Sequence, residues 1–322
     1  MCQPKMNEND SSPSDSASVV IVGPGAMGCL HAALLGRMPH LDVVLLDYRA
    51  DRAERINEQG VIIEAPTDRY TVPVSCTANA QELSTTDLVI IFTKAYDTAT
   101  AAEHCAPVVG PGTAVLTLQN GLGNYQVLQE HLPTKQVLAG TTSSGATLLD
   151  VGYVRQAGLG QTVLGSPTGN QALANGAVEL LKSAGLEVAI TTDVDALLWR
   201  KVLINCAINP LTALTQRRNG ELLESAALRN LAGQVAEEVY RVGQAAGINW
   251  GELDPRREVE KVCRATATNQ SSMLQDVLAG RRTEVEYITG AVAHAAERHA
   301  TAAPLCQCLT ALIEGLTQQH LQ

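Results

Sequence analysis

The chain has 322 residues, 45% of them hydrophobic, and is long and apolar enough for two domains with buried cores. Acidic residues outnumber basic ones 33 to 23, which gives a formal net charge of −10. This balance argues against binding to nucleic acid or to an anionic membrane surface, because both need clustered cations. A local basic pocket for a phosphorylated cofactor is still compatible with it.

The first 17 residues, MCQPKMNENDSSPSDSA, are polar and rich in Ser, Asp and Asn. They lack the apolar segment of a signal peptide and predict a disordered tail over 1–17. No apolar run of the chain approaches the length that spans a membrane. The cysteines are scattered and form no CxxC pair. They indicate reduced thiols in a cytoplasmic protein, with neither a disulfide framework nor a metal site.

From Ser18 onward, short apolar runs alternate with stretches of helical period. Strands are predicted at 18–23, 42–47, 87–93 and 113–118, and helices at 26–38 and 50–60. The runs GVIIEA and YTVPVSCT predict two further strands, GYVRQAGLGQTVLGSP predicts antiparallel strands with glycine turns, and the last predicted strand is 185–193. Strands that alternate with helices predict a parallel sheet with right-handed crossovers.

After Asp193 the character of the chain changes. Residues 195–248 and 256–320 carry long helical periods and no convincing strand. We therefore expect an α/β protein, with an N-terminal Rossmann-type dinucleotide-binding domain at 18–192 followed by an all-helical C-terminal domain at 193–322. No linker rich in proline or glycine separates the two, so they are predicted to pack closely.

The first predicted strand runs into the turn GPGAMG, whose members are Gly23, Pro24, Gly25, Ala26, Met27 and Gly28. The pattern G-x-G-x-x-G is weak evidence alone, but here it follows a predicted strand and opens a predicted helix. The first glycine would permit the tight turn, the second would let the backbone approach a pyrophosphate, and the third would let the helix lie close to the strand. The helix N-terminus favours negative charge. We therefore expect dinucleotide binding here in preference to a purely structural strand–turn–helix.

The second predicted strand ends at Asp47, about 20 residues after Gly28. An acid at this place suits the ribose 2′-hydroxyl of NAD. Arg49 and Arg52 follow at once, and an arginine there can accommodate the 2′-phosphate of NADP. The two signals conflict, and either arginine could instead belong to a solvated helix start.

Residues 199–213, WRKVLINCAINPLTA, would suit a buried helix, yet Lys201, Asn205 and Asn209 interrupt it at a spacing of four. This spacing places the three side chains on one face of a helix, one turn apart. Buried polar groups are costly without partners, and a buried lysine is more so. The stripe is therefore either a satisfied network between helices or part of a ligand site. Pro210 beside it tends to kink the helix.

Six motifs occur in order: GPGAMG, TKAYD at 93–97, QNGLGN at 119–124, WRKVLINCAINPLTA, NGEL at 219–222 and NQSSMLQDVLAGRRTEVEYITG at 269–290. With them, the chain resembles the 2-dehydropantoate 2-reductase (ketopantoate reductase) family from Ser18 to the C-terminal region. The resemblance implies a Rossmann domain paired with a helical domain. It also implies an oxidoreductase that reduces ketopantoate to pantoate with NADPH, on the route to pantothenate and coenzyme A.

The resemblance also implies roles for single residues. The family's catalytic lysine falls on Lys201 and its glutamate on Glu284. Its substrate-binding residues fall on Asn120, Asn205, Asn209, Asn219, Asn269 and Ser272, of which the serine would hold the substrate carboxylate. Beyond the glycine turn, its cofactor-binding positions fall on Asp47, Arg49, Lys94, Asn120, Ala146 and Glu284. Asp47 departs from the commonest family pattern, so NADH is not excluded as the donor.

The predicted reaction needs specific side-chain chemistry. A ketone reduction leaves negative charge on the carbonyl oxygen and takes up one proton, and a charged Lys201 could supply both the hydrogen-bond donor and the proton. Its apolar surroundings should lower its pKa, whereas a nearby carboxylate should raise it. Glu284 is the candidate carboxylate.

Other interpretations stay open at this point. Lys94 could be a surface lysine at a strand end, Glu284 could form a salt bridge with Arg281 or Arg282, and the serines 271 and 272 could cap a helix. The chain could also be a related reductase of another branched 2-oxo acid, or a non-catalytic NADP-binding sensor. A sensor would need the glycine turn but neither Lys201 nor Glu284. The oligomeric state is open, and a homodimer is one option.

Overall fold

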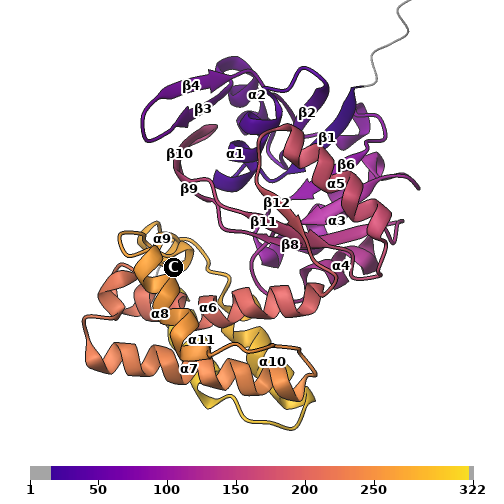
Figure 1. Ribbon diagram of the computed structural model, residues 1–322. Helices are drawn as coiled ribbons and strands as arrows, with labels where there is room; N and C mark the ends of the chain where they lie inside the picture. Colours follow the sequence, from indigo (N-terminus) through magenta and orange to yellow (C-terminus); the bar gives the residue numbers. More distant parts are fainter. Residues whose placement is uncertain (1–15, 319–322) are drawn as a thin grey trace, which may run out of the picture.

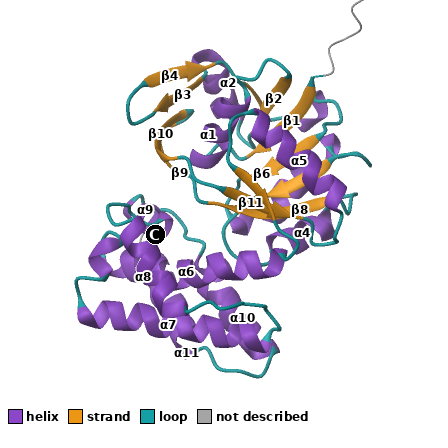
Figure 2. Cartoon of the chain, viewed as in Figure 1, coloured by secondary structure: helices purple, strands orange, loops and turns teal. Residues whose placement is uncertain are grey.

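Parallel strands form the centre of the N-terminal half of the protein (Figures 1 and 2). The computed structural model describes residues 16–318. The strands of the larger sheet are β1 (Ala17–Val22), β2 (Leu41–Leu46), β5 (Ser75–Thr77), β6 (Leu88–Ile91), β7 (Ala114–Thr117), β8 (Val137–Thr142), β11 (Thr162–Gly165) and β12 (Val188–Ile190). They lie in the order β12-β11-β8-β7-β6-β1-β2-β5.

Strand β1 begins inside the stretch that was expected to be a tail. Ala17 donates a backbone hydrogen bond to His40 and pairs with Leu41, so it belongs to the sheet. The expectation of a tail up to residue 17 is therefore wrong at its last position. Residues 1–15 of that stretch lie outside the described part of the chain.

Helices cover both faces of this sheet: α1 (Ala26–Leu35), α2 (Ala50–Gln59), α3 (Thr98–Cys105), α4 (Asn124–His131) and α5 (Gln171–Ser183). In β1, Val19 and Ile21 point into a core shared with α1 and α5, whereas Val20 and Val22 point into one shared with α3 and α4. Successive side chains of a strand alternate between faces, so a strand covered on both sides is apolar throughout. This double coverage explains the uninterrupted apolar runs.

The strands from β5 to β8 run parallel, but β11 pairs antiparallel with β8. The pairing of β11 agrees with the expectation of antiparallel strands in the segment GYVRQAGLGQTVLGSP, and the strands before it agree with that of a parallel sheet. Between the two strands the chain forms a hairpin of β9 (Gly145–Asp150) and β10 (Tyr153–Gly158), which reverses its direction. The hairpin joins β3 (Val61–Glu64) and β4 (Arg69–Val72) in a second sheet of order β4-β3-β10-β9.

Helices make up the C-terminal half: α6 (Val194–Thr215), α7 (Ala226–Ala245), α8 (Pro255–Ala265), α9 (Ser272–Leu278), α10 (Thr289–Arg298) and α11 (Pro304–Gln318), with single turns η4 (Gly220–Leu222) and η5 (Val285–Tyr287). The carboxylate of Asp193 caps α6 by accepting a 3.0 Å hydrogen bond from Ala196 N–H. Helix α6 packs against α7, α8, α9 and α11 and also contacts β8 and β11 (Figure 1). The expected α/β class with a Rossmann-type half and a helical half is confirmed.

Two further features concern the chain as a whole. None of the helices in the range 16–318 is both long enough and apolar enough to cross a membrane. The seven cysteines within this range are free thiols, six of them buried, whereas Cys2 lies outside it. Burial raises the pKa of Cys29 to about 12, so this thiol is poorly reactive.

Candidate active site

The glycine turn joins β1 to α1 and leaves its outer side open. Gly23 has a φ of +93°, in the region that favours glycine. A Cβ on Gly28 would lie 2.1 Å from the carbonyl oxygen of Gly23, so only glycine lets α1 start this close to the turn. A Cβ on Gly25, by contrast, would meet nothing within 4 Å beyond its chain neighbours. Open space before the N-terminal residues Ala26 and Met27 of a helix is what a pyrophosphate needs, so the turn fits a dinucleotide.

Asp47 follows β2 directly and is only 2% exposed. Its Oδ1 accepts a 2.8 Å hydrogen bond from Tyr48 N–H, and its Oδ2 lies 3.0 Å from Arg52 Nε without hydrogen-bond alignment. Burial raises the pKa of this carboxyl, and the charge of Arg52 opposes the rise. Arg52 also donates to the carbonyl oxygen of Pro24 at 3.2 Å, which ties the acid to the glycine turn. The Asp47 Oδ2 atom accepts no hydrogen bond, but it is buried against Arg52, so the structure does not present it to a ribose hydroxyl.

Arg49 occupies the N-cap position of α2, beside Asp47 at the same end of β2. Its side chain is 51% exposed and pairs at 2.5 Å with Asp51, which is exposed as well. Exposed ion pairs are weak. The Arg49 guanidinium can therefore exchange Asp51 for another anion. A cation, Arg49, and an acid, Asp47, thus both stand at the end of β2, where a dinucleotide of this fold would place its adenosine ribose.

Lys94 lies in the turn after β6, where it meets the helical half. Its Nζ donates to Asp276 Oδ2 at 2.5 Å and to Glu284 Oε2 at 3.4 Å. Burial lowers the pKa of Lys94, but Glu284 and Asp276 together raise it above its usual value. Buried Gln119 holds the turn by donating to the Thr93 carbonyl at 3.0 Å. Lys94 therefore forms ion pairs with two acids of the helical half and is not a solvated surface lysine.

Lys201 lies on α6 and points toward the cofactor half. Its Nζ donates a 2.5 Å hydrogen bond to the carbonyl oxygen of Thr142, the last residue of β8. Burial lowers the pKa of Lys201 to about 8, although the charge of Glu284 raises it. Both directions agree with the expectation from sequence. A lysine with a pKa near neutrality can exchange a proton during turnover.

The two asparagines of the stripe lie on the same helix as Lys201. Asn205 is half-buried and Asn209 is 5% exposed. Helix α6 continues through Pro210, and the hydroxyl of Thr212 donates to the carbonyl oxygens of Ile208 and Asn209. The expected single face of polar side chains is therefore present.

The remaining predicted substrate residues divide into two groups. Asn219 and Asn269 are joined, because Asn219 N–H donates to the Asn269 carbonyl at 3.0 Å. The Asn219 side chain donates to Thr266, while its Oδ1 is buried without a partner. Asn120 is half-buried in the loop after β7 and accepts from the Asn124 side chain through its carbonyl. Asn120 thus comes from the cofactor half and the other two from the helical half.

The two serines at the start of α9, Ser271 and Ser272, differ in what their hydroxyl groups contact. Ser271 is the cap, since its Oγ accepts from Leu274 N–H at 3.1 Å and lies 2.7 Å from the hydroxyl of Thr212 on α6. Ser272 is exposed and takes no part in the cap. Its hydroxyl is therefore available to a ligand. Ala146, the tentative cofactor residue, is half-buried on β9.

Glu284 precedes η5 and is 6% exposed. Its Oε1 accepts a 2.9 Å hydrogen bond from Ala95 N–H and its Oε2 faces Lys94, so it does not pair with Arg281 or Arg282. The sequence interpretation missed Asp276, a 3% exposed acid that binds Lys94. The sequence feature that could have indicated Asp276 is its position four residues after Ser272, which places the two on one face of a helix. Glu284 was predicted to be the carboxylate that raises the pKa of Lys201, and it does so, whereas its contacts with Lys94 and Ala95 were not predicted.

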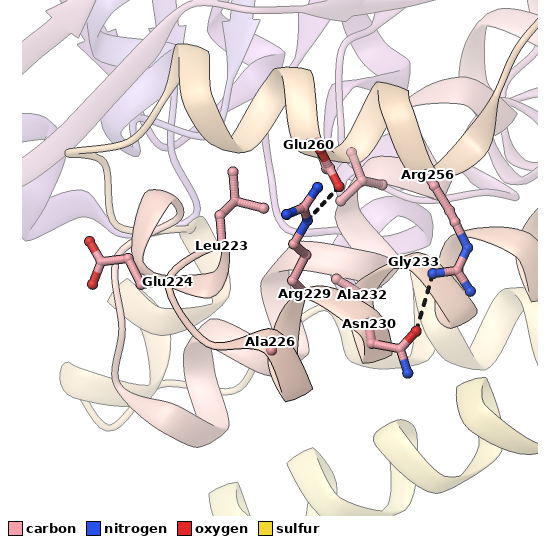
Figure 3. Close-up of a pocket in the computed structure, with 10 residues that line it drawn as sticks. Leu223, Glu224, Ala226, Arg229, Asn230, Ala232, Gly233, Arg256 and Glu260 are labelled. Atoms are coloured by element: carbon pink, nitrogen blue, oxygen red, sulfur yellow. Dashed lines mark hydrogen bonds and ion pairs between the residues drawn. The ribbon is translucent and has the colours of Figure 1, made fainter.

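The cavity drawn in Figure 3 lies away from this cluster, between α7 and α8. It has a volume of about 380 Å³ and is lined by paired polar groups. Arg229 binds Glu260 at 2.6 Å, and Arg256 binds Asn230 at 3.2 Å. None of the predicted site residues lines it, so we assign it no role in the chemistry.

Comparisons with known proteins identify the family of this chain. Family models described as "Ketopantoate reductase PanE/ApbA" and its C-terminal part match residues 19–169 and 193–317. The chain belongs to the ketopantoate reductase family. A 2-dehydropantoate 2-reductase of Halobacterium salinarum is 38% identical over 298 residues, which cover 92% of this chain and 97% of that protein.

Solved structures show the same architecture. A PanE/ApbA family ketopantoate reductase from Ralstonia eutropha superposes with a TM-score of 0.85 at 27% identity, over 95% of this chain and 100% of that one. A D-mandelate dehydrogenase solved with NADH and anilino(oxo)acetate superposes with a TM-score of 0.87 at 25% identity, over 94% and 99%. The family resemblance inferred from the motifs is confirmed.

Proposed function

We propose that this protein reduces the ketone of 2-dehydropantoate to the secondary alcohol pantoate, with a hydride from a reduced nicotinamide dinucleotide. The name of the relatives, among them the Halobacterium protein, supports this substrate. The observation that carries the proposal is the position of Lys201. It is the first polar residue of the α6 stripe and reaches the cofactor half at Thr142, which ends a strand of the same sheet whose glycine turn fits a dinucleotide.

The nicotinamide, when bound, supplies the hydride that attacks the carbonyl carbon. Lys201, in its ammonium form, donates a hydrogen bond to the carbonyl oxygen and then the proton that completes the alcohol. The overall change adds one hydride and one proton to the 2-oxo acid. Glu284 favours the charged form of Lys201, because its carboxylate raises the pKa of Lys201 against the effect of burial.

Substrate binding follows from the polar groups around Lys201. We assign the substrate carboxylate to the exposed hydroxyl of Ser272, and the hydroxyl and carbonyl region to Asn205 and Asn209. Asn120 approaches from the cofactor half. The joined pair Asn219 and Asn269 forms the far wall. Reaction and binding groups thus come from both halves, so closure of the halves would complete the site.

For the cofactor we propose NADPH, with Arg49 as the ligand of the 2′-phosphate and Lys94 and Ala146 near the nicotinamide side. The weak, exposed pairing of Arg49 with Asp51 supports this, because the guanidinium can turn to a phosphate at low cost. NADH is the second candidate. It is favoured by the acid Asp47 directly after β2 and by the NADH in the D-mandelate dehydrogenase structure.

The same dehydrogenase favours a second candidate substrate, another branched or aromatic 2-oxo acid. The test is the loss of absorbance of the reduced nicotinamide, with the purified chain, each of NADPH and NADH, and either 2-dehydropantoate or the 2-oxo acid of mandelate. A higher kcat/KM for 2-dehydropantoate supports the proposal. A higher kcat/KM for the other acid would assign that acid as the substrate. No oxidation of either cofactor with either acid would overturn the enzymatic assignment.

The wider context belongs to the same proposal. We assign residues 18–192 to the cofactor domain and 193–322 to the substrate domain, and the ranges of the two matching family models support this division. We place the enzyme in the cytoplasm, on the route to pantothenate and coenzyme A. The expected partner is a small molecule and neither nucleic acid nor membrane.

A further inference from the structure

Asp276 is a buried acid that holds two cations at once. It lies on α9, is 3% exposed, and binds Lys94 Nζ through Oδ2 at 2.5 Å. Its Oδ1 accepts a 3.1 Å hydrogen bond from Arg281 Nε, five residues along the chain. A buried carboxylate is costly unless it is paired, so two cationic partners are the condition for its presence here.

The pair with Lys94 belongs to a row of alternating charges between the two halves. Arg281 and Asp276 come from the helical half, Lys94 from the cofactor half, and Glu284 again from the helical half. The charge of Glu284 in turn acts on Lys201. Lys94 therefore lies between two carboxylates, 2.5 Å from Asp276 and 3.4 Å from Glu284.

One ammonium faces two carboxylates, so its charge is shared between them. Both Glu284 and Asp276 raise the pKa of Lys94, and Asp276 makes the closer contact, at 2.5 Å against 3.4 Å. Glu284 keeps negative charge that Lys94 does not cancel, and this charge stabilises the ammonium of Lys201. Without Asp276, Glu284 would be the remaining carboxylate against Lys94, and its field at Lys201 would be more fully cancelled.

The ion pair between Lys94 and Asp276 also fixes α9, the helix that carries Ser272, the proposed ligand of the substrate carboxylate. Ser272 and Asp276 are four residues apart on α9 and therefore lie on one face, one turn apart. The Lys94 ammonium anchors this face to the turn after β6. A second contact, from Thr147 on β9 to Gln275 at 3.4 Å, joins the same helix to the cofactor half. Because α9 is short, an anchor at Asp276 also determines where Ser272 stands.

We propose that Asp276 is a positioning residue of the reductase site, which holds Lys94 so that Glu284 serves Lys201 and Ser272 stands at a fixed distance from the hydride donor. This inference rests on the proposed function. Asp276 itself touches no reacting atom in this arrangement. It acts by its ion pair with Lys94, which affects the charge balance at Glu284 and fixes the position of α9.

Other charged side chains on the elements around α6 are engaged elsewhere. Arg200 donates to the Trp250 carbonyl, Glu221 accepts from Arg218 N–H, and Glu260 pairs with Arg229 and Arg264. Buried Glu238 accepts from the first N–H groups of α11, at Leu305 and Cys306. The β8 segment VLAGTT carries no charge. Glu284 is the charged group that shifts the pKa of Lys201, so a change at Asp276 reaches Lys201 through it.

The test is Asp276→Asn in the full chain, with kcat and KM for 2-dehydropantoate measured across pH. Asparagine keeps the size of the side chain but removes its charge. We expect KM for the oxo acid to rise by about tenfold or more, as one misplaced polar contact costs. We also expect the basic limb of the kcat/KM profile to move to lower pH. The matched control is Glu237→Gln, which removes an acid from an ion pair with Arg256 on the same half. It should change neither quantity.

A double-mutant cycle separates positioning from a general loss of packing. In a Lys94→Gln background, the Asp276→Asn change should have a much smaller effect on KM and on the basic limb, because its partner is already gone. Additive effects would overturn the inference, as would an unchanged KM and pH profile in a folded single variant. If instead the wild-type chain turns over no 2-oxo acid, the proposed function fails and the inference fails with it, whereas an active wild type with an unaffected Asp276→Asn variant overturns the inference alone.

Discussion

The Nζ atom of Lys201 donates a 2.5 Å hydrogen bond to the carbonyl oxygen of Thr142, across the junction between the helical half and the cofactor half. Lys201 is the first residue of a polar stripe on α6, and Thr142 ends strand β8. A main-chain carbonyl is the kind of acceptor that a substrate carbonyl oxygen could replace. In the proposed function, the oxygen of the substrate ketone would take the place of this carbonyl opposite Lys201.

Lys201→Ala should abolish the proton donor while the cofactor half stays intact. We expect turnover to fall by roughly 10²–10⁴-fold, the usual contribution of a positioned acid, with dinucleotide binding close to that of the wild type. Steady-state kinetics and a fluorescence titration with reduced dinucleotide measure the two quantities. Lys182→Ala, a change at a half-exposed lysine of α5 that pairs with Glu179, is the control. Turnover retained by Lys201→Ala would remove Lys201 from the mechanism.

The rate of reduction should fall as pH rises through about 8. Burial lowers the pKa of Lys201 to about 8, and the form that donates the proton is the protonated one. Below this pKa the group is fully charged and the rate does not depend on it. Above it, kcat/KM should fall about tenfold per pH unit. A profile that stays flat up to pH 10 would show that Lys201 is not the titrating acid.

Glu284→Gln should move that basic limb further toward acid pH. The Glu284 carboxylate raises the pKa of Lys201, so its removal leaves burial unopposed. Glu286→Gln, two residues along the chain, removes an exposed acid paired with Arg282 and should leave the limb in place. A limb that stays at the wild-type pH in the Glu284 variant would contradict the coupling between these two groups.

Two glycines of the same turn should respond differently to alanine. A Cβ at Gly28 would clash with the Gly23 carbonyl at 2.1 Å, so Gly28→Ala should lower Tm or prevent folding. A Cβ at Gly25 meets only open space, and its backbone is extended with φ −79°, so Gly25→Ala should fold like the wild type. It should nevertheless weaken dinucleotide binding by about tenfold or more, because the methyl group occupies the approach of the pyrophosphate. Thermal unfolding and dinucleotide titration distinguish the two, and normal binding by Gly25→Ala would contradict the assigned cradle.

Arg49→Ala should reduce the use of NADPH and leave that of NADH unchanged. A guanidinium that pairs with the 2′-phosphate contributes only to the phosphorylated cofactor, and its loss should raise KM for NADPH by about tenfold. Arg55→Ala, at an exposed arginine that pairs with Asp150, is the control on the same helix. An equal change with both cofactors, or none, would show that Arg49 does not select the donor and would leave Asp47 as the determinant.

The sequence alone determined the first strands and helices of the cofactor half, the change to helices after Asp193, the glycine turn and the polar stripe of α6, but not β8, β9 or helices α3 to α5. These follow from local rules: strands buried on both faces are apolar throughout, a helix repeats every 3.6 residues, and a close turn demands glycine. Lys201, Asn205 and Asn209 share a face because of their spacing in the chain. Contacts between neighbours along one element need no knowledge of the rest of the fold.

Only the tertiary structure decided which distant groups meet. Asp276 and Lys94 are 182 positions apart, and Lys201 and Thr142 are 59 apart. No local pattern pairs them, because such contacts depend on how the halves pack. The same holds for the pairing of β11 with β8 as its partner and for the contact between Ser271 and Thr212, 59 positions apart. Each of these depends on a partner that long-range packing brings into reach.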